Sequence, residues 1–245
     1  QYVRKKLRLY WSPQQISGRL GRDRKTHISP VTIYTWIKHD KSAGGSLYRF
    51  LRQSNRKRRK RKGSEDSRGQ IPDRRWIDQR PKIADQRKRI GDWESDTLVG
   101  KSRASYIASH VDRKSRYLVL AKLKDKSAGS MNYSTRRAFT NIPTEKVKTM
   151  TFDNGKEFAG FKVLEGSLSM QGYFAHAYSS YERGTNENTN GLLRQFFPKG
   201  TDFHQLKTRQ LDKVGNLLNN RPRKCLNYRT PTEVFWSGRV RCASD

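Results

Sequence analysis

Seven consecutive cations, from Arg56 to Lys62, constrain the folding of this chain more than any other feature of its sequence. Neighbouring like charges cannot pack together in an apolar interior, so they stay solvated unless phosphates neutralise them. The chain is therefore expected to fold separately on the two sides of a basic arm. The arm could be a merely solubilising linker, or it could bind phosphates through Arg56, Lys57, Arg58, Arg59, Lys60, Arg61 and Lys62.

The composition points to a folded protein with a polyanionic partner. Lys and Arg number 53 against 22 Asp and Glu, a formal charge of +31 in 245 residues, while 33% hydrophobic and 11% aromatic residues suffice for a core. No apolar run of about 18 residues and no signal-peptide pattern is present, so a cytoplasmic protein is expected. Cys225 and Cys242 are too few for a disulfide framework or a zinc site.

Two Ser–Pro pairs, Ser12–Pro13 and Ser29–Pro30, each place a capping hydroxyl before a proline, which is typical of a helix start. Apolar residues then recur at helical spacing, namely Ile16, Leu20, Ile33, Trp36 and Ile37. Two short helices joined by a polar stretch suit a helix-turn-helix, although helix pairs are common in proteins without this role. The residues of the second helix predicted to face DNA are Thr32, Tyr34, Thr35 and Lys38. We assign residues 1–53 to this module and 54–90 to the basic arm and a connector.

The remainder of the chain predicts a mixed α/β fold. Three strand-like runs, at 92–100, 104–111 and 116–123, are separated by short turns and indicate an antiparallel meander. Helix-compatible and strand-like runs then alternate, in the order 127–140, 147–152, 157–170, 173–178 and 183–197. Strands that first form hairpins and then alternate with helices give a five-stranded mixed sheet with flanking helices.

Three carboxylates lie in or beside these elements: Asp96 in the first strand, Asp153 after the fourth, and Glu187 in the last helix. Asp153 opens an Asp-Asn-Gly turn at the carboxyl end of a strand, where ligands of α/β sheets usually bind. Alone, each carboxylate is more often a cap or an ion-pair partner. Together they form an oxygen-only ligand set that suits Mg²⁺ or Mn²⁺, and two such ions support in-line displacement at phosphorus.

The spacing of 33 residues between Asp153 and Glu187 matches the DDE pattern of RNase H-like transposases and integrases. Matching phrases are Gly91-Asp-Trp-Glu-Ser-Asp96, Phe152-Asp-Asn-Gly-Lys-Glu-Phe158, Glu182-Arg-Gly-Thr-Asn-Glu187, Phe197-Pro-Lys-Gly-Thr-Asp-Phe203, Asn219-Asn-Arg-Pro-Arg223 and Thr230-Pro-Thr-Glu-Val-Phe235. With them the chain resembles bacterial transposases of the IS-thirty insertion-sequence family over nearly its whole length. It departs at Ser95, where that family commonly has Gly.

The resemblance implies an RNase H-like catalytic core at residues 91–240 and two Mg²⁺ or Mn²⁺ ions. It selects Asp96, Asp153 and Glu187 as catalytic residues and metal ligands. Asp92 and Glu94 share one strand face with Asp96 and could assist it, but we expect them to be surface charges. Arg194, two helical turns after Glu187, together with Lys156 and Arg183, is expected to bind DNA phosphates. We assign His176 no role and expect a packed side chain.

The leading hypothesis is a transposase that acts on the terminal inverted repeats of its own element. Water would cut the strand at the element's end, and the freed 3′-hydroxyl would then attack a second phosphodiester. The resemblance further implies double-stranded DNA at element ends and target, a homo-oligomer assembled on that DNA, and a place at the nucleoid of a bacterial cytoplasm. The alternatives are an inactive copy that only binds DNA and a general nuclease. Because the chain starts at Gln1, we expect its DNA-binding module to be truncated.

Overall fold

The computed structural model describes residues 1–23, 26–52, 71–101, 104–176 and 179–237. The predicted basic arm, Arg56 to Lys62, lies outside the described residues. The fold divides into two compact units, one formed by residues 1–63 and 217–245 and the other by residues 64–216. No helix of the described part combines the length and apolar character needed to cross a bilayer.

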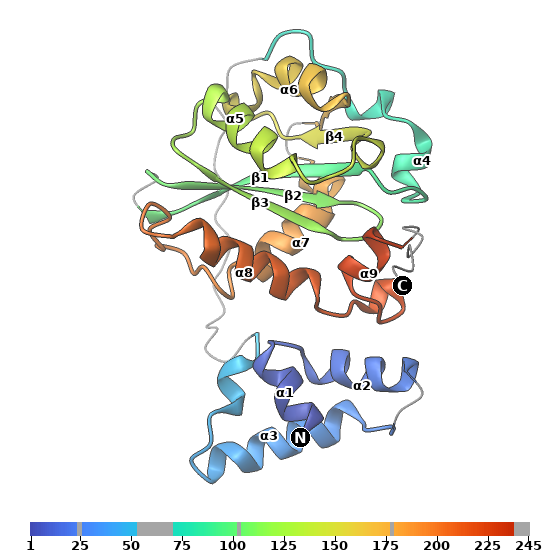
Figure 1. The fold of residues 1–245 in the computed structure, drawn as a ribbon, viewed down its shortest axis with the longest axis vertical. Coiled ribbons are helices and arrows are strands. Elements are labelled where there is room, and N and C mark those ends of the chain that lie inside the picture. The colour runs from blue at the N-terminus through green and yellow to red at the C-terminus, as the bar shows by residue number, and fades with distance from the viewer. Residues whose placement is uncertain (24–25, 53–70, 102–103, 177–178, 238–245) are drawn as a thin grey trace, which may run out of the picture. The chain divides into compact units, whose positions relative to one another are not determined.

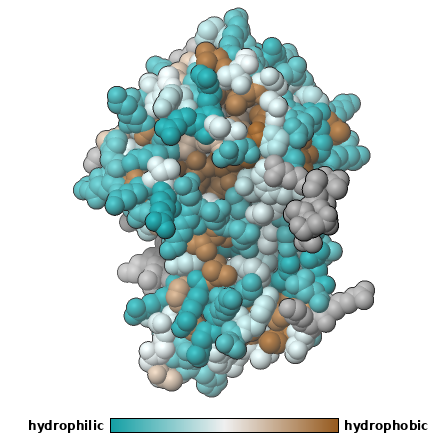
Figure 2. All heavy atoms as spheres, viewed as in Figure 1, coloured by the Kyte–Doolittle hydropathy of each residue, from teal (hydrophilic) through white to brown (hydrophobic). Residues whose placement is uncertain are grey.

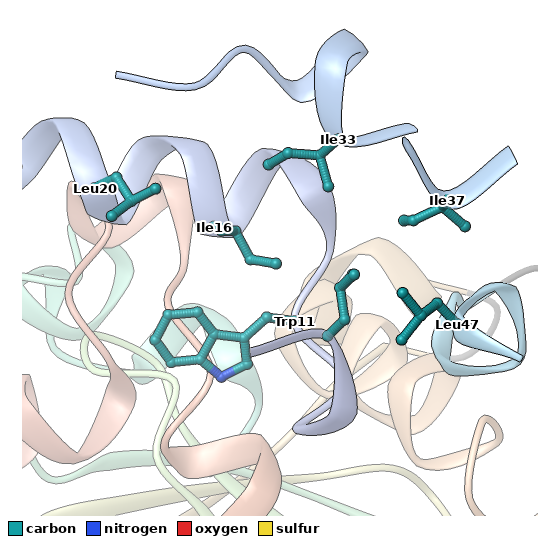
Figure 3. Close-up of a cluster of buried hydrophobic side chains, with 7 residues drawn as sticks. Trp11, Ile16, Leu20, Ile33, Ile37 and Leu47 are labelled. Carbon is teal, nitrogen blue, oxygen red and sulfur yellow. The ribbon is translucent and has the colours of Figure 1, made fainter. Parts of the chain in front are cut away.

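The first unit begins with three helices, α1 (Tyr2–Arg8), α2 (Pro13–Arg22) and α3 (Pro30–Ser42), followed by the 3-10 helix η1 (Leu47–Phe50). Both predicted Ser–Pro starts are confirmed, because Ser12 Oγ accepts the Gln15 N–H at 3.3 Å and Ser29 Oγ accepts the Thr32 N–H at 3.0 Å. The apolar faces of these elements meet in one cluster, shown in Figure 3, made by Leu7, Trp11, Ile16, Leu20, Ile33, Ile37 and Leu47. This core leaves the opposite face of α3 exposed.

The C-terminal part of the first unit holds the end of α8 (Thr208–Asn219), the 3-10 helix η7 (Lys224–Leu226) and α9 (Pro231–Phe235). The Arg19 guanidinium donates to both oxygens of the Glu233 carboxylate at 2.8 Å each. A Cβ on Gly18 would lie 2.2 Å from the Tyr228 ring, so a larger residue would require this ring to move. The two ends of the chain are thus tied together within this unit.

The second unit is built on a five-stranded sheet in the order β3-β2-β1-β4-β5. Its strands are β1 (Asp92–Val99), β2 (Tyr106–Asp112), β3 (Leu118–Leu123), β4 (Thr149–Phe152) and β5 (Gln171–Phe174). The predicted meander is confirmed, since β1 pairs antiparallel with β2 and β2 with β3, whereas β4 is parallel to both β1 and β5. The mixed sheet therefore has β1 at its centre.

Helices cover both faces of this sheet (Figure 1). One face carries α5 (Ala128–Phe139) and α6 (Phe161–Leu168), and the other carries α7 (Gly184–Leu193), which contacts β1 and β2. Shorter elements are η2 (Ile77–Gln79), α4 (Lys82–Asp85), η4 (Thr144–Lys146), η5 (Lys156–Phe158) and η6 (Ser180–Arg183). Hydrophilic residues cover most of the face in Figure 2, as the composition predicts.

Candidate active site

Asp96, in the second half of β1, and Asp153, directly after β4, lie near each other on two neighbouring strands. In the parallel pair of β1 and β4, Glu94 faces Thr151, and each aspartate follows two residues later. Because parallel strands run about 4.8 Å apart and side chains repeat every second residue, both carboxylates reach the same place. The Arg183 guanidinium touches both, with Nη1 3.6 Å from Asp96 Oδ1 and Nη2 3.8 Å from Asp153 Oδ2.

The turn after β4 fixes the Asp153 carboxylate. The Gly155 N–H donates to Asp153 Oδ1 at 2.9 Å, a bond that Asp makes readily within such turns. The Asn154 side-chain amide donates to the Ala175 carbonyl at 2.9 Å, which ties the turn to the end of β5. A Cβ on Gly155 would lie 2.5 Å from Glu157 Oε2 and 2.8 Å from Asp153 Oδ1. Glycine therefore lets two carboxylates approach the same point.

Two asparagines bind α7 to β1. The Asn186 N–H donates to Glu94 Oε2 at 2.8 Å, and its side-chain amide donates to the carbonyls of Glu94 at 2.9 Å and Ser109 at 3.0 Å. One helical turn later, Asn190 Nδ2 donates to Asp96 Oδ2 at 2.8 Å. Residues four apart share a helix face, so this face of α7 is fixed against Asp96.

Glu187 lies in the first turn of α7, one residue after Asn186 and three before Asn190, and its side chain is exposed. Residues three apart are neighbours on a helix surface, so Glu187 borders the asparagine that binds Asp96. Within the described ranges, no three His, Cys, Asp or Glu side chains are arranged to hold a metal ion. The structure thus brings the two aspartates together but does not join Glu187 to them in a preformed cluster.

The donor chemistry fits a hard divalent ion, because all three carboxylates offer oxygen and Mg²⁺ or Mn²⁺ prefers oxygen. Burial raises the pKa of the Asp96 carboxyl, and the negative charges of Asp153 and Glu157 raise it further. The Arg183 charge and a hydrogen bond from the Thr97 N–H lower it. Such a site favours a cation between its carboxylates, and in this structure the cation is the guanidinium of Arg183.

Glu157 is a residue of this site that sequence reasoning missed. Its side chain is 4% exposed, it lies beside Asp153 across Gly155, and Lys126 Nζ is 3.3 Å from its Oε1. The available signal was its position four residues after Asp153 in the same turn, in the phrase Asp-Asn-Gly-Lys-Glu. Its sequence neighbours, Lys156 and Phe158, do not indicate which way the side chain points.

Comparison with known proteins adds to this geometry. No protein-family model matches the chain. It is 42% identical over 231 residues to the transposase for insertion sequence element IS4351 of Bacteroides fragilis, covering 94% of this chain and 71% of that protein. The chain belongs to the IS-thirty family of insertion-sequence transposases. A second relative is transposase InsI for insertion sequence element IS30A of Escherichia coli, 40% identical over 96% of this chain and 64% of its own length.

One solved structure bears on the fold of this family member. A chain in the cryo-EM structure of the simian T-cell lymphotropic virus intasome in complex with PP2A regulatory subunit B56 gamma matches with a TM-score of 0.50. The match covers 61% of this chain and 55% of that chain at 20% sequence identity. Together with the strand order, it confirms the predicted RNase H-like α/β fold.

The expectation that Asp92 and Glu94 are surface charges is wrong, because both residues are buried, with side chains that are 1% exposed. Asp92 accepts the Thr149 hydroxyl at 2.8 Å. Glu94 accepts the Asn186 N–H and pairs with Arg113, whose Nη1 lies 3.2 Å from Glu94 Oε1. The physical reason is that β1 is the central strand, covered by neighbours on both edges and by α7.

The residues predicted to contact DNA differ in their exposure and in their contacts within the protein. Arg194 donates to the carbonyl of Val99 at 2.9 Å, which links the end of α7 to the end of β1, while Lys156 is exposed. The four side chains predicted to face DNA from α3 are all exposed: Thr32, Tyr34, Thr35 and Lys38. No nucleic acid is present, so these assignments stay predictions.

His176 stacks on Trp76 with 5.3 Å between ring centroids, but its side chain is 40% exposed and so less packed than expected. Its Nδ1 lies 2.9 Å from Glu182 Oε1 and its Nε2 lies 3.0 Å from Asp78 Oδ2. The hydrogen bond with Glu182 is the main cause that raises the pKa of the imidazole. These contacts give His176 a structural explanation.

Proposed function

We propose that this chain carries the catalytic centre of a DNA transposase, in which Asp96, Asp153 and Glu187 hold Mg²⁺ or Mn²⁺. The supporting observation is the placement of two aspartates at matching positions of the adjacent parallel strands β1 and β4, with α7 hydrogen-bonded to Asp96. The reaction would be hydrolysis of the strand at a terminal inverted repeat, followed by attack of the freed 3′-hydroxyl on a target strand. In the proposed organisation residues 91–240 form the catalytic domain.

A pair of divalent ions, when bound, would supply activation of the attacking oxygen and stabilisation of the leaving oxygen. The chain's own residues prepare their ligands. Asp96 is oriented from two sides, by the Thr97 N–H at 2.8 Å and by Asn190 at 2.8 Å. Asp153 is oriented by the Gly155 N–H. Carboxylates held in this way lose little freedom on binding a cation, which is the value of such outer contacts.

DNA would be bound by residues 1–53 and by the arm in residues 54–90. The exposed face of α3 presents hydroxyl, phenol and ammonium groups, which contact base edges and phosphates in helix-turn-helix proteins. The formal charge of +31 favours a polyanion. We further propose assembly of several copies on DNA, because two element ends must be processed together.

The test is strand transfer on DNA that carries terminal inverted repeats, with Mg²⁺ or Mn²⁺ present. Asp153→Asn should abolish product while leaving DNA binding nearly unchanged, because the amide cannot replace the lost charge at the ion. Asp212→Asn, the same change on an exposed part of α8, is the matched control and should keep full activity. Product formation by Asp153→Asn would remove this residue from the proposed role. If the unaltered chain binds DNA but forms no product, the result would favour an inactive DNA-binding protein. If it cleaves arbitrary DNA as readily as DNA with terminal repeats, the result would favour a general nuclease.

A further inference from the structure

Arg183 lies where a cation is needed, but it is held there weakly. Its side chain is 15% exposed and its two terminal nitrogens lie 3.6 and 3.8 Å from the carboxylates of Asp96 and Asp153. These distances exceed the usual 2.7–2.9 Å of charge-assisted hydrogen bonds. The contact is therefore one of charge with charge, without the directional bonds that arginine usually makes to carboxylates.

The other donors of Arg183 are also poorly used. Nη1 donates to the Ser95 carbonyl at 3.4 Å, a long bond, and Nε is buried with no hydrogen-bond partner among the described residues. A buried donor without a partner destabilises this position of the side chain. A side chain in this state leaves its position readily when a stronger ligand for the carboxylates arrives.

We infer that Arg183 is an internal counter-ion that keeps Asp96 and Asp153 together when no metal is bound and gives way to Mg²⁺ or Mn²⁺. Two neighbouring carboxylates repel each other, and a guanidinium between them removes that repulsion. A divalent ion carries twice its charge and binds oxygen directly, so it competes successfully for the same position. The inference rests on the proposed metal site and makes Arg183 a positioning residue.

The inference also accounts for the state of Glu187. With a guanidinium between the aspartates, their charge is compensated, and a third carboxylate is not drawn in. This agrees with the exposed position of Glu187 and with the lack of a preformed three-carboxylate cluster in the described part of the chain. Once released, the Arg183 charge becomes available to a DNA phosphate, the contact expected for it from the sequence.

The experiment compares the unaltered 245-residue chain with Arg183→Gln in two measurements, the Kd for Mn²⁺ and the Tm with EDTA or with saturating Mn²⁺. Loss of the competing cation should lower the Kd for Mn²⁺ about tenfold. The Tm in EDTA should fall by about 2–4 °C, and this difference should vanish in Mn²⁺. An arginine with a merely structural role would lower the Tm equally in both conditions and would leave the Kd unchanged or raised; either result overturns the inference.

Two further variants show whether the changes in Kd and Tm arise from loss of the Arg183 charge or from a general disturbance of the start of α7. Arg183→Lys keeps the charge and should restore both the Kd and the Tm in EDTA toward the unaltered values. Arg116→Gln is the matched control, because Arg116 Nη1 donates to Thr185 Oγ1 at 2.9 Å in the same first turn of α7. It should change the Tm equally with and without Mn²⁺. If Arg183→Gln fails to fold, Arg183→Lys and the double variant Arg183→Gln with Asp153→Asn decide, since removing one carboxylate should restore the Tm in EDTA.

Failure of the proposed function would look different. In that case the unaltered chain would bind no Mn²⁺, or would bind it equally well after Asp153→Asn. If Mn²⁺ binds through Asp153 but Arg183→Gln binds it no more tightly, the metal site stands and only the role of Arg183 is lost.

Discussion

The helical core of residues 1–52 and the interior around β1 are stabilised in different ways. In residues 1–23 and 26–52, Ser17 is the one buried polar residue, and the core is a cluster of aliphatic residues with Trp11. On β1 and β2, by contrast, the buried polar side chains are Asp92, Glu94, Ser95, Ser109, His110 and Asp112. The first region resembles an ordinary apolar core, and the second is a polar network inside a sheet.

The difference between the two interiors reflects where each region carries its proposed functional groups. In the helical region the core only supports an exposed face, so its interior can be purely apolar. In the sheet Asp96, the proposed metal ligand, lies on the same strand as the buried Glu94, and both are bound by asparagines of α7. A buried polar network fixes positions only if its members are satisfied, and it is costly when one partner is lost. We therefore expect the two regions to respond differently to conservative substitutions.

The largest expected effect is that of Glu94→Gln. The change is nearly isosteric, yet it leaves Arg113, which is 6% exposed, without the charge that pairs with it at 3.2 Å. Breaking a buried ion pair by removing one partner costs about 3–5 kcal/mol in unfolding free energy. Urea unfolding measured by circular dichroism checks this. Glu145→Gln in η4, where the side chain is exposed, is the control and should stay within about 0.5 kcal/mol.

A loss below about 1 kcal/mol in Glu94→Gln would contradict the account of a charged interior. The companion change Arg113→Met tests the same ion pair from its other partner. It removes the other partner and leaves the buried Glu94 without its counter-charge, so the unfolding free energy should again fall by about 3–5 kcal/mol.

The sequence predicted α2, α3 and the order and type of the elements from β1 to α7, but it predicted neither α8 and α9 nor the interior of β1. Hairpin spacing predicted the meander, and Ser–Pro pairs predicted α2 and α3, because these signals are local. α1 was not predicted, since a short cationic segment has little helical signal until its Leu7 packs into the cluster. Asp92 and Glu94 were misjudged for a related reason. Glu94 contacts α7 and Arg113, and Asp92 contacts Thr149 of β4, and these partners are distant in sequence.

The candidate site was likewise predictable only in part. Sequence motifs and their spacing selected Asp96, Asp153 and Glu187. The parallel register of β1 and β4 explains why the two aspartates lie near each other. The position of Arg183 between them could not be foreseen. It depends on how η6 enters α7, and the residues of η6 carry no pattern that encodes a direction.

The second expected effect is acid destabilisation through His110. Its ring is 0% exposed, shares a 2.8 Å hydrogen bond with Ser95 Oγ, and burial lowers its pKa to about 3. In the unfolded chain His110 binds a proton below about pH 6.5, whereas in the native state it does so only below about pH 3. Unfolding free energy should therefore fall as the pH drops through this window, by up to about 1.4 kcal/mol per pH unit.

The measurement is the urea midpoint between about pH 7 and pH 5, in the unaltered chain and in His110→Gln. The variant has no group that titrates here, so its midpoint should depend less on pH. Parallel curves for the two proteins would show that His110 is not held neutral in the native state.

The smallest expected effect completes the comparison on the helical side. Ile33 on α3 is 2% exposed and is surrounded by aliphatic neighbours. Ile33→Val removes one methylene and leaves no polar group unsatisfied, so unfolding free energy should fall by only about 0.5–1.5 kcal/mol. Hydrogen exchange should show the loss of protection in residues 13–42 and none in residues 92–123, because the two stretches belong to separate compact units. If Ile33→Val proved as costly as Glu94→Gln, the helical core would be as specifically constrained as the sheet, and the contrast between a supporting core and a functional one would disappear.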